Sequence, residues 1–181
     1  MTSSARPNPL LRLDEAIDHV RGAASAPVTL IEYGDYECPS CFQATAALTI
    51  MMAHFGDGLR FAFRHFPLRE VHPHAELAAE AAEAAGAQGK FWPMHDLLFA
   101  NQHHLKEKHL QGYAAQLGLD MARYENEMKD HVYLQRVQEQ ISSGEHLAIR
   151  STPAFYVNGV FTDVSFGLQH LHQAVERVLA A

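Results

Sequence analysis

The sequence predicts an α/β fold in the order β-α-β, a block of helices, then β-β-α, and three observations support this prediction. Two strand-like runs, 28–33 and 59–66, flank the stretch 42–55, which lacks Gly and Pro and has apolar residues at helical spacing. No convincing strand occurs from 74 to about 146, where the composition is helical. Strand character returns at 153–157.

Local signals place the remaining elements. Gly56-Asp57-Gly58 is expected to stop the first long helix. Asn158-Gly159 predicts a two-residue hairpin, and 160–162 is its returning strand. Residues up to about Pro9 are expected to be disordered, and a short helix is expected at 14–20. Further helices are predicted at 75–85, 90–101, 111–117, 120–129, 132–146 and 168–179.

Length and composition limit the class of protein. A chain of 181 residues suits one domain, or one domain with a large insertion, and 48% apolar with 19% charged residues is ordinary for a globular protein. The net charge of −7 argues against nucleic acid as a partner. No run has the length of a transmembrane helix, so we expect no membrane association. The first nine residues lack the apolar core of a signal peptide, which predicts a cytoplasmic protein, or an extracytoplasmic one if a signal has been removed.

Both cysteines of the chain lie in one segment, Glu37-Cys38-Pro39-Ser40-Cys41, at a strand-to-helix junction. A C-x-x-C pair near a β-α-β pattern is typical of a redox site. If the helix starts at Pro39, Cys38 is its N-cap, and the unpaired N–H groups and the helix dipole favour a thiolate there. We therefore expect Cys38 to have a depressed pKa and to be the nucleophile. Cys41, one turn later, returns to the same face and can resolve a mixed disulfide.

Two other uses of the cysteines are weaker. A structural zinc site needs four ligands, and the histidines near 65–74 and at His103-His104 lack the spacing of a zinc finger. A purely structural disulfide would close a very small loop and would stabilise the chain little. We therefore name no metal ligand.

Four segments in the right order carry a resemblance to a known family. They are Glu32-Tyr33-Gly34-Asp35-Tyr36-Glu37-Cys38-Pro39-Ser40-Cys41, Arg64-His65-Phe66-Pro67-Leu68, Gly89-Lys90-Phe91-Trp92-Pro93-Met94-His95-Asp96 and Ser151-Thr152-Pro153-Ala154-Phe155-Tyr156-Val157-Asn158-Gly159. In these segments the chain resembles the DsbA-like thiol-disulfide oxidoreductases of the thioredoxin superfamily. The resemblance implies a thioredoxin-like fold with an inserted α-helical domain. The implied division is an N-terminal extension with a short helix (1–25), a core (26–67 and 148–181) and a helical insertion (68–147).

The resemblance also assigns roles to residues outside the cysteine pair. Thr152-Pro153 matches the loop whose proline is cis and lies against the active-site disulfide, where the exposed backbone of Thr152 can bind a substrate chain as a short strand. Glu32, six residues before Cys38, matches a buried carboxylate that accepts the Cys41 proton during resolution. Pro39 and Ser40 support the site. Asp35 and Glu37 are expected to be exposed charges.

These inferences together predict a thiol-disulfide oxidoreductase that acts on protein or peptide thiols and disulfides. It needs no cofactor beyond the Cys38–Cys41 disulfide, and glutathione or a thioredoxin-type protein is its expected redox partner. Strongly oxidising relatives have His at the position of Ser40, so we expect a less oxidising disulfide here. Two alternatives remain open, a glutathione-linked transferase or isomerase on the same fold, and a metal-binding or partner-binding module that uses Cys38 and Cys41.

Overall fold

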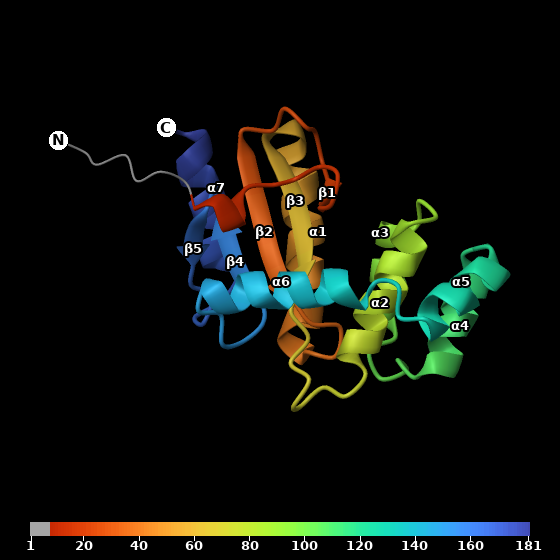
Figure 1. Ribbon diagram of the computed structural model, residues 1–181. Coiled ribbons are helices and arrows are strands. Elements are labelled where there is room, and N and C mark those ends of the chain that lie inside the picture. The colour runs from red at the N-terminus through yellow and green to blue at the C-terminus, as the bar shows by residue number, and fades with distance from the viewer. Residues whose placement is uncertain (1–7) are drawn as a thin grey trace. The chain divides into compact units, whose positions relative to one another are not determined.

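The computed structural model of the protein describes residues 8–181, and in that range it has five strands and seven α-helices (Figure 1). The disorder expected up to Pro9 falls mostly on residues 1–7, which lie outside the described range. In chain order the elements are the 3₁₀ turn η1 (Pro9–Leu11), β1 (His19–Arg21), β2 (Val28–Gly34), α1 (Pro39–Phe55), η2 (Gly56–Gly58), β3 (Leu59–His65), α2 (Ala75–Gly86), α3 (Phe91–Ala100), α4 (Glu107–Gln116), α5 (Met121–Lys129), α6 (Leu134–His146), β4 (Ala154–Val157), β5 (Val160–Thr162) and α7 (Gln169–Leu179).

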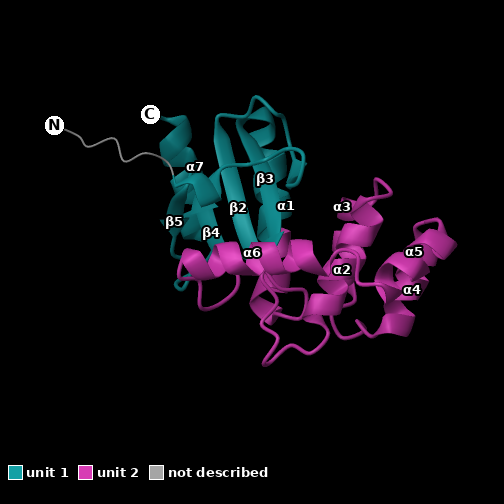
Figure 2. Cartoon of the chain, viewed as in Figure 1, with its two compact units in different colours: residues 1–33, 47–64, 154–181 teal, residues 34–46, 65–153 magenta. Residues whose placement is uncertain are grey.

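The chain forms two compact units (Figure 2). Unit 1 comprises the described residues up to Tyr33 together with Ala47–Arg64 and Ala154–Ala181, and it contains most of the sheet. Unit 2 comprises Gly34–Ala46 and His65–Pro153 and contains helices α2 to α6. The predicted helical insertion, 68–147, falls within unit 2, which also holds both cysteines.

The sheet has the strand order β1-β3-β2-β4-β5. Strand β1 runs antiparallel to β3, and β4 runs antiparallel to both β2 and β5. Strand β2 is buried along almost its whole length, as expected for a central strand with an apolar, β-branched sequence. Asn158 and Gly159 join β4 to β5 with φ angles of 46° and 80°, the left-handed conformation that a tight hairpin requires.

The helix predicted at 14–20 is wrong, because residues 15–17 form only a turn and strand β1 begins at His19. Two N–H groups of Arg64 bind the two carboxylate oxygens of Asp18 at 2.8 Å each. Asp18 in turn accepts a hydrogen bond from the backbone N–H of Asp14 at 2.8 Å. The next residues, His19–Arg21, pair with β3. Pairing with the sheet and with Arg64 therefore outweighs the weak local preference for a helix.

Helix α2 is the central helix of unit 2, and it packs against α3, α4, α5 and α6. A helix surrounded in this way needs small side chains on several faces, because backbones of neighbouring helices must approach closely. This requirement explains the alanine-rich sequence of α2. The buried alanines are Ala75, Ala78, Ala79, Ala81, Ala82, Ala84 and Ala85.

Glu83 on α2 has a buried carboxylate, and two basic side chains contact its oxygens. His65 Nε2 lies 2.9 Å from Oε1, and Arg136 Nε lies 3.0 Å from Oε2. The side chains of Glu83 and His65 are each only 1% exposed, and that of Arg136 is 25% exposed. Such a group is tolerated because its oxygens are paired.

Replacing Glu83 with Gln should lower the free energy of unfolding by about 3 kcal/mol, because Arg136 would keep a partly buried charge without its counter-ion. Urea unfolding followed by circular dichroism measures this loss. The matched control is Glu76→Gln on the same helix, whose ion pair with Arg69 at 3.2 Å is more exposed and should contribute less than about 1 kcal/mol. Equal losses in the two variants would contradict a special role for the buried carboxylate.

Candidate functional site

Both cysteines are buried at the start of α1. Cys38 stands directly before Pro39, the first residue of the helix, and is 6% exposed. Cys41 lies in the first turn and is completely buried. Pro39 and Ser40, between them, are exposed. The sequence argument that Pro39 begins the helix therefore agrees with the structure, since proline needs no N–H partner at this position.

The Cys38 thiol contacts the loop before β4. Its Sγ atom donates a hydrogen bond to the backbone carbonyl of Thr152 at 3.3 Å. The peptide bond between Thr152 and Pro153 is cis. Thr152 is 8% exposed, whereas Ser151 before it is exposed and Pro153 after it is half-buried.

The pKa of Cys38 is lowered from 9.0 to about 5. Hydrogen bonding to the Cys41 side chain is the largest cause, and burial acts in the opposite direction. Hydrogen bonds to Thr152 and to the backbone N–H groups of Cys41 and Ser40 lower the pKa further. These N–H groups belong to the first turn of α1, where no earlier carbonyl is available to them. A pKa of about 5 favours the thiolate of Cys38 at neutral pH, and ionisation removes the hydrogen bond that the thiol donates to Thr152.

Asp35 is buried close before the cysteines, so the expectation that it is an exposed charge is wrong. It is 1% exposed and accepts hydrogen bonds from the backbone N–H groups of Glu37 and Leu68, each at 2.7 Å. His72 Nδ1 lies 2.7 Å from the second oxygen of Asp35. These contacts satisfy the oxygens of the buried side chain, as buried polar groups require. Asp35 thus joins the cysteine turn to the segment that follows β3.

Glu37, next to Cys38, is also less exposed than expected. Its side chain is 17% exposed and lies 3.1 Å from Nδ1 of His74. The other carboxylate oxygen accepts a hydrogen bond from the backbone N–H of His74 at 2.6 Å. Pairing with His74 holds the negative charge of Glu37 in place, and the cysteine turn is therefore fixed by two carboxylate–histidine pairs.

Gln102 is a further site residue that sequence reasoning missed. Its side-chain amide donates to the backbone carbonyls of Tyr36 at 3.0 Å and Cys38 at 2.7 Å. Tyr36 itself is buried, and its hydroxyl lies 3.1 Å from Nδ1 of His95. A glutamine in the segment after α3 gives no sequence signal of such a role, because only the fold brings it to the cysteine turn.

Glu32, the predicted proton acceptor, lies in unit 1 in strand β2. It is 2% exposed and pairs in register with Phe155 of β4. The cysteines and Thr152 belong to unit 2. The expected burial of Glu32 is thus present, and its role toward Cys41 stays a prediction.

A cysteine with a lowered pKa at a helix start, followed one turn later by a second cysteine, is an arrangement typical of thiol redox sites. The family model described as thioredoxin matches residues 15–177, so the chain belongs to the thioredoxin family. This match confirms the predicted thioredoxin-like fold.

Solved structures agree with the family and with its DsbA-like branch. Oxidised BdbD from Bacillus subtilis has a TM-score of 0.82 at 23% identity, covering 92% of this chain and 95% of that one. A thioredoxin-like oxidoreductase from Silicibacter pomeroyi has a TM-score of 0.79 at 25% identity, covering 96% and 95%. Wolbachia pipientis alpha-DsbA1 has a TM-score of 0.78 at 20% identity, covering 97% and 96%. These similarities support the predicted architecture of this chain, a thioredoxin-like core with a helical insertion.

Curated relatives match the chain over a small part of their own length. The Na(+)/H(+) antiporter NhaA 1 of Salinispora arenicola is 43% identical over 171 residues, which cover 94% of this chain and 26% of the relative. The corresponding NhaA of Herminiimonas arsenicoxydans is 44% identical over 147 residues, covering 81% and 23%. The chain thus spans about a quarter of the length of these relatives. Among residues 8–181, no helix combines the length and apolar character needed to cross a membrane.

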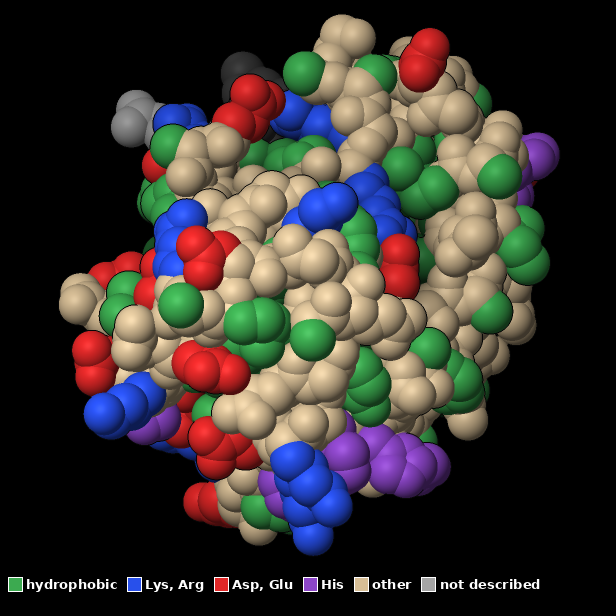
Figure 3. Space-filling view, turned by 90° about the vertical axis from the view of Figure 1, so that its right-hand side faces the viewer, with side chains coloured by type: hydrophobic (Ala, Val, Ile, Leu, Met, Phe, Trp, Pro, Cys, Tyr) green, Lys and Arg blue, Asp and Glu red, His purple; other side chains and the backbone are tan. Residues whose placement is uncertain are grey.

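On the face drawn in Figure 3, Lys and Arg side chains are separated by acidic and uncharged ones. They do not merge into one continuous basic surface there. A basic stripe is the usual electrostatic footprint of nucleic-acid binding. This face therefore offers no support for a nucleic-acid partner.

Proposed function

We propose that the protein is a thiol-disulfide oxidoreductase that exchanges disulfides with protein or peptide substrates through Cys38 and Cys41. The observation that supports this most is the lowered pKa of Cys38, about 5. The thiolate is the nucleophile in disulfide exchange, so a thiol that ionises below neutral pH is ready to react. The structural neighbours described as oxidoreductases have the same fold, which agrees with this activity.

The proposed reaction proceeds in two exchanges. The Cys38 thiolate attacks one sulfur of a substrate disulfide, forms a mixed disulfide and releases the other substrate sulfur as a thiolate. Cys41 then loses its proton and attacks the Cys38 sulfur, which releases the second substrate thiolate. The substrate disulfide gains two electrons, and the Cys38–Cys41 pair loses two. The reverse sequence oxidises a substrate dithiol, and neither direction needs another cofactor.

The backbone at Thr152 is the proposed substrate-binding element. Its carbonyl oxygen lies 3.3 Å from the Sγ atom of Cys38, so this backbone is next to the reacting sulfur. An extended substrate chain that pairs with the backbone of Thr152 would bring its own cysteine to Cys38. Main-chain pairing of this kind tolerates many substrate sequences.

Glu32 is the proposed acceptor of the Cys41 proton, and Glu32→Gln tests this role. The variant should slow the second exchange by at least about a hundredfold, the lower end of what a general base contributes. Quenched-flow alkylation of a single turnover should show a mixed disulfide that accumulates in the variant while the first exchange keeps its rate. Equal slowing of both exchanges would instead indicate that Glu32 acts only on the structure.

A redox titration in glutathione buffers tests the proposed activity itself. Acid quenching and thiol alkylation, read by mass spectrometry, should show one two-electron transition between the dithiol and the Cys38–Cys41 disulfide. Because Ser40 stands where strongly oxidising relatives have His, the potential should be more negative than the roughly −120 mV of DsbA. Absence of any intramolecular disulfide would overturn the proposal and favour a metal-binding or partner-binding use of the two cysteines.

A further inference from the structure

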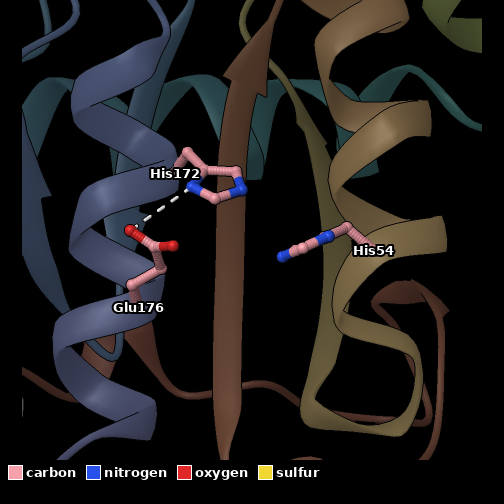
Figure 4. Close-up of side chains that lie close together, drawn as sticks. All are labelled: His54, His172 and Glu176. Carbon is pink, nitrogen blue, oxygen red and sulfur yellow. Dashed lines mark ion pairs between the residues drawn. The ribbon is translucent and has the colours of Figure 1, made fainter.

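Three side chains with metal-binding atoms meet in unit 1, in the sheet-bearing part of the fold. His54 lies in the last turn of α1, and His172 and Glu176 lie on α7 (Figure 4). Their ligand atoms, one from each residue, all lie within 4.8 Å of one another. None of these residues takes part in the thiol chemistry described above.

The geometry is close to that of a bound transition metal. His172 Nδ1 and Glu176 Oε2 lie 3.5 Å apart, and neighbouring nitrogen and oxygen ligands of tetrahedral zinc lie about 3.4 Å apart. The His54 ring reaches toward this pair from the other helix, as Figure 4 shows. All three ligand atoms lie within 4.8 Å of one another, so a small movement of the exposed His54 side chain is enough to complete a tetrahedral arrangement.

The backbone and a neighbouring aromatic ring hold the donors in this arrangement. His172 and Glu176 are four residues apart on α7, so they project from the same face of the helix. The ring of Phe55 lies with its centroid 4.7 Å from that of His54 and 4.8 Å from that of His172. The histidines thus share one aromatic neighbour, and their own ring centroids are 5.2 Å apart.

We propose that His54, His172 and Glu176 form a binding site for a divalent transition-metal ion and that this ion is Zn²⁺. Two imidazoles and one carboxylate are a ligand set that zinc uses in proteins, with water in the fourth position. Nitrogen donors favour such an ion over Mg²⁺ and Ca²⁺, which prefer oxygen ligands. His54 and Glu176 are exposed and His172 is half-buried, so an ion and its water reach the site without rearrangement of the core.

A bound ion would join the end of α1 to the C-terminal helix. A Cβ atom added at Gly58, just after α1, would come within 3.4 Å of the side chain of Leu179 at the end of α7, so the two helix ends lie close together. An ion that binds only the folded arrangement stabilises it by mass action. Zinc should therefore raise the melting temperature, and the effect should weaken at acidic pH because protons compete for the imidazole nitrogens.

Isothermal titration calorimetry with ZnCl₂ tests the site. The full chain with Cys38→Ser and Cys41→Ser is used, so that thiolates do not bind the probe. We expect one high-affinity ion per chain, and His54→Ala or His172→Ala added to this background should weaken its binding by at least about tenfold. His170→Ala, also on α7 but outside the cluster, is the matched control and should bind like the background. Thermal unfolding without zinc verifies that each variant is folded.

The outcomes separate the proposal from its alternatives. A zinc-dependent rise in melting temperature that is present in the background and in His170→Ala, but lost in His54→Ala and His172→Ala, supports it. Unchanged high-affinity binding in the His54 and His172 variants would place the ion elsewhere and overturn it. Absence of high-affinity binding in the background would also overturn it and leave His172 and Glu176 as an ion pair within α7. Because the cysteines are absent from this test, its result is independent of the proposed redox function.

Discussion

Replacing Cys38 with serine is expected to abolish disulfide exchange. Replacing Cys41 with serine should instead trap a mixed disulfide between Cys38 and the substrate. The Cys38 thiolate makes the first bond to substrate, so without it neither exchange can begin. The expected loss is at least about a thousandfold, the scale seen when an enzyme loses its nucleophile. Cys41→Ser keeps the first exchange and loses only the resolving attack.

A model peptide disulfide with a fluorescent group measures both effects. Cys41→Ser should form a stable mixed disulfide that migrates as a heavier band on non-reducing gels and disappears on reduction. Cys38→Ser should form none. Ser40→Ala, which changes the exposed residue between them, is the control and should retain turnover. Equal covalent capture by the two cysteine variants would contradict the assignment of attack to Cys38 and resolution to Cys41.

The reaction of Cys38 with an alkylating reagent is expected to follow a titration with a midpoint near pH 5, the lowered pKa of this thiol. An ordinary cysteine would react appreciably only near its usual value of 9.0. The Cys41→Ala variant removes the largest cause of the shift, because hydrogen bonding to the Cys41 side chain lowers the pKa most and alanine has no donor to replace it. Its midpoint should move upward. An unchanged midpoint in that variant would assign the shift to the start of α1 instead.

The same shift makes the stability of the reduced protein depend on pH. A thiol whose pKa is lower in the folded state contributes fully above its unfolded value of 9.0, and the contribution is lost as the pH falls through about 5. At pH 7 the expected contribution of Cys38 is about 3 kcal/mol. Urea unfolding of the reduced protein between pH 4 and 8 measures it. Cys38→Ser should lose this part of the pH dependence, and an identical profile in both proteins would contradict the lowered pKa.

Most elements of the fold could be predicted from the sequence because their signals are local. Pro39 at the start of a helix and the Asn158-Gly159 hairpin each depend on a few neighbouring residues. The helix predicted at 14–20 does not form because this segment contacts strand β3, including its residue Arg64, which lies far away along the chain.

The residues of the candidate site also fall into two groups, those that a local motif predicts and those that only the fold brings together. The cysteine pair is a local motif, and its proximity to the helix start follows from spacing alone. The burial of Asp35 and the bond from Gln102 to the Cys38 carbonyl depend on segments 33 and 64 positions away. Charged and amide side chains are usually exposed, so nothing in their own sequence context predicts these roles.

The sequence by itself determined where the helices and strands form and which two thiols can react, because helix caps, turns and the C-x-x-C spacing act within one or two turns of the chain. The tertiary structure decided which side chains surround those thiols and which distant ones meet. Asp35 reached His72 and His54 reached His172 only when their segments packed together. Packing depends on the whole chain, since burial and pairing free energies become available only once distant segments have come into contact.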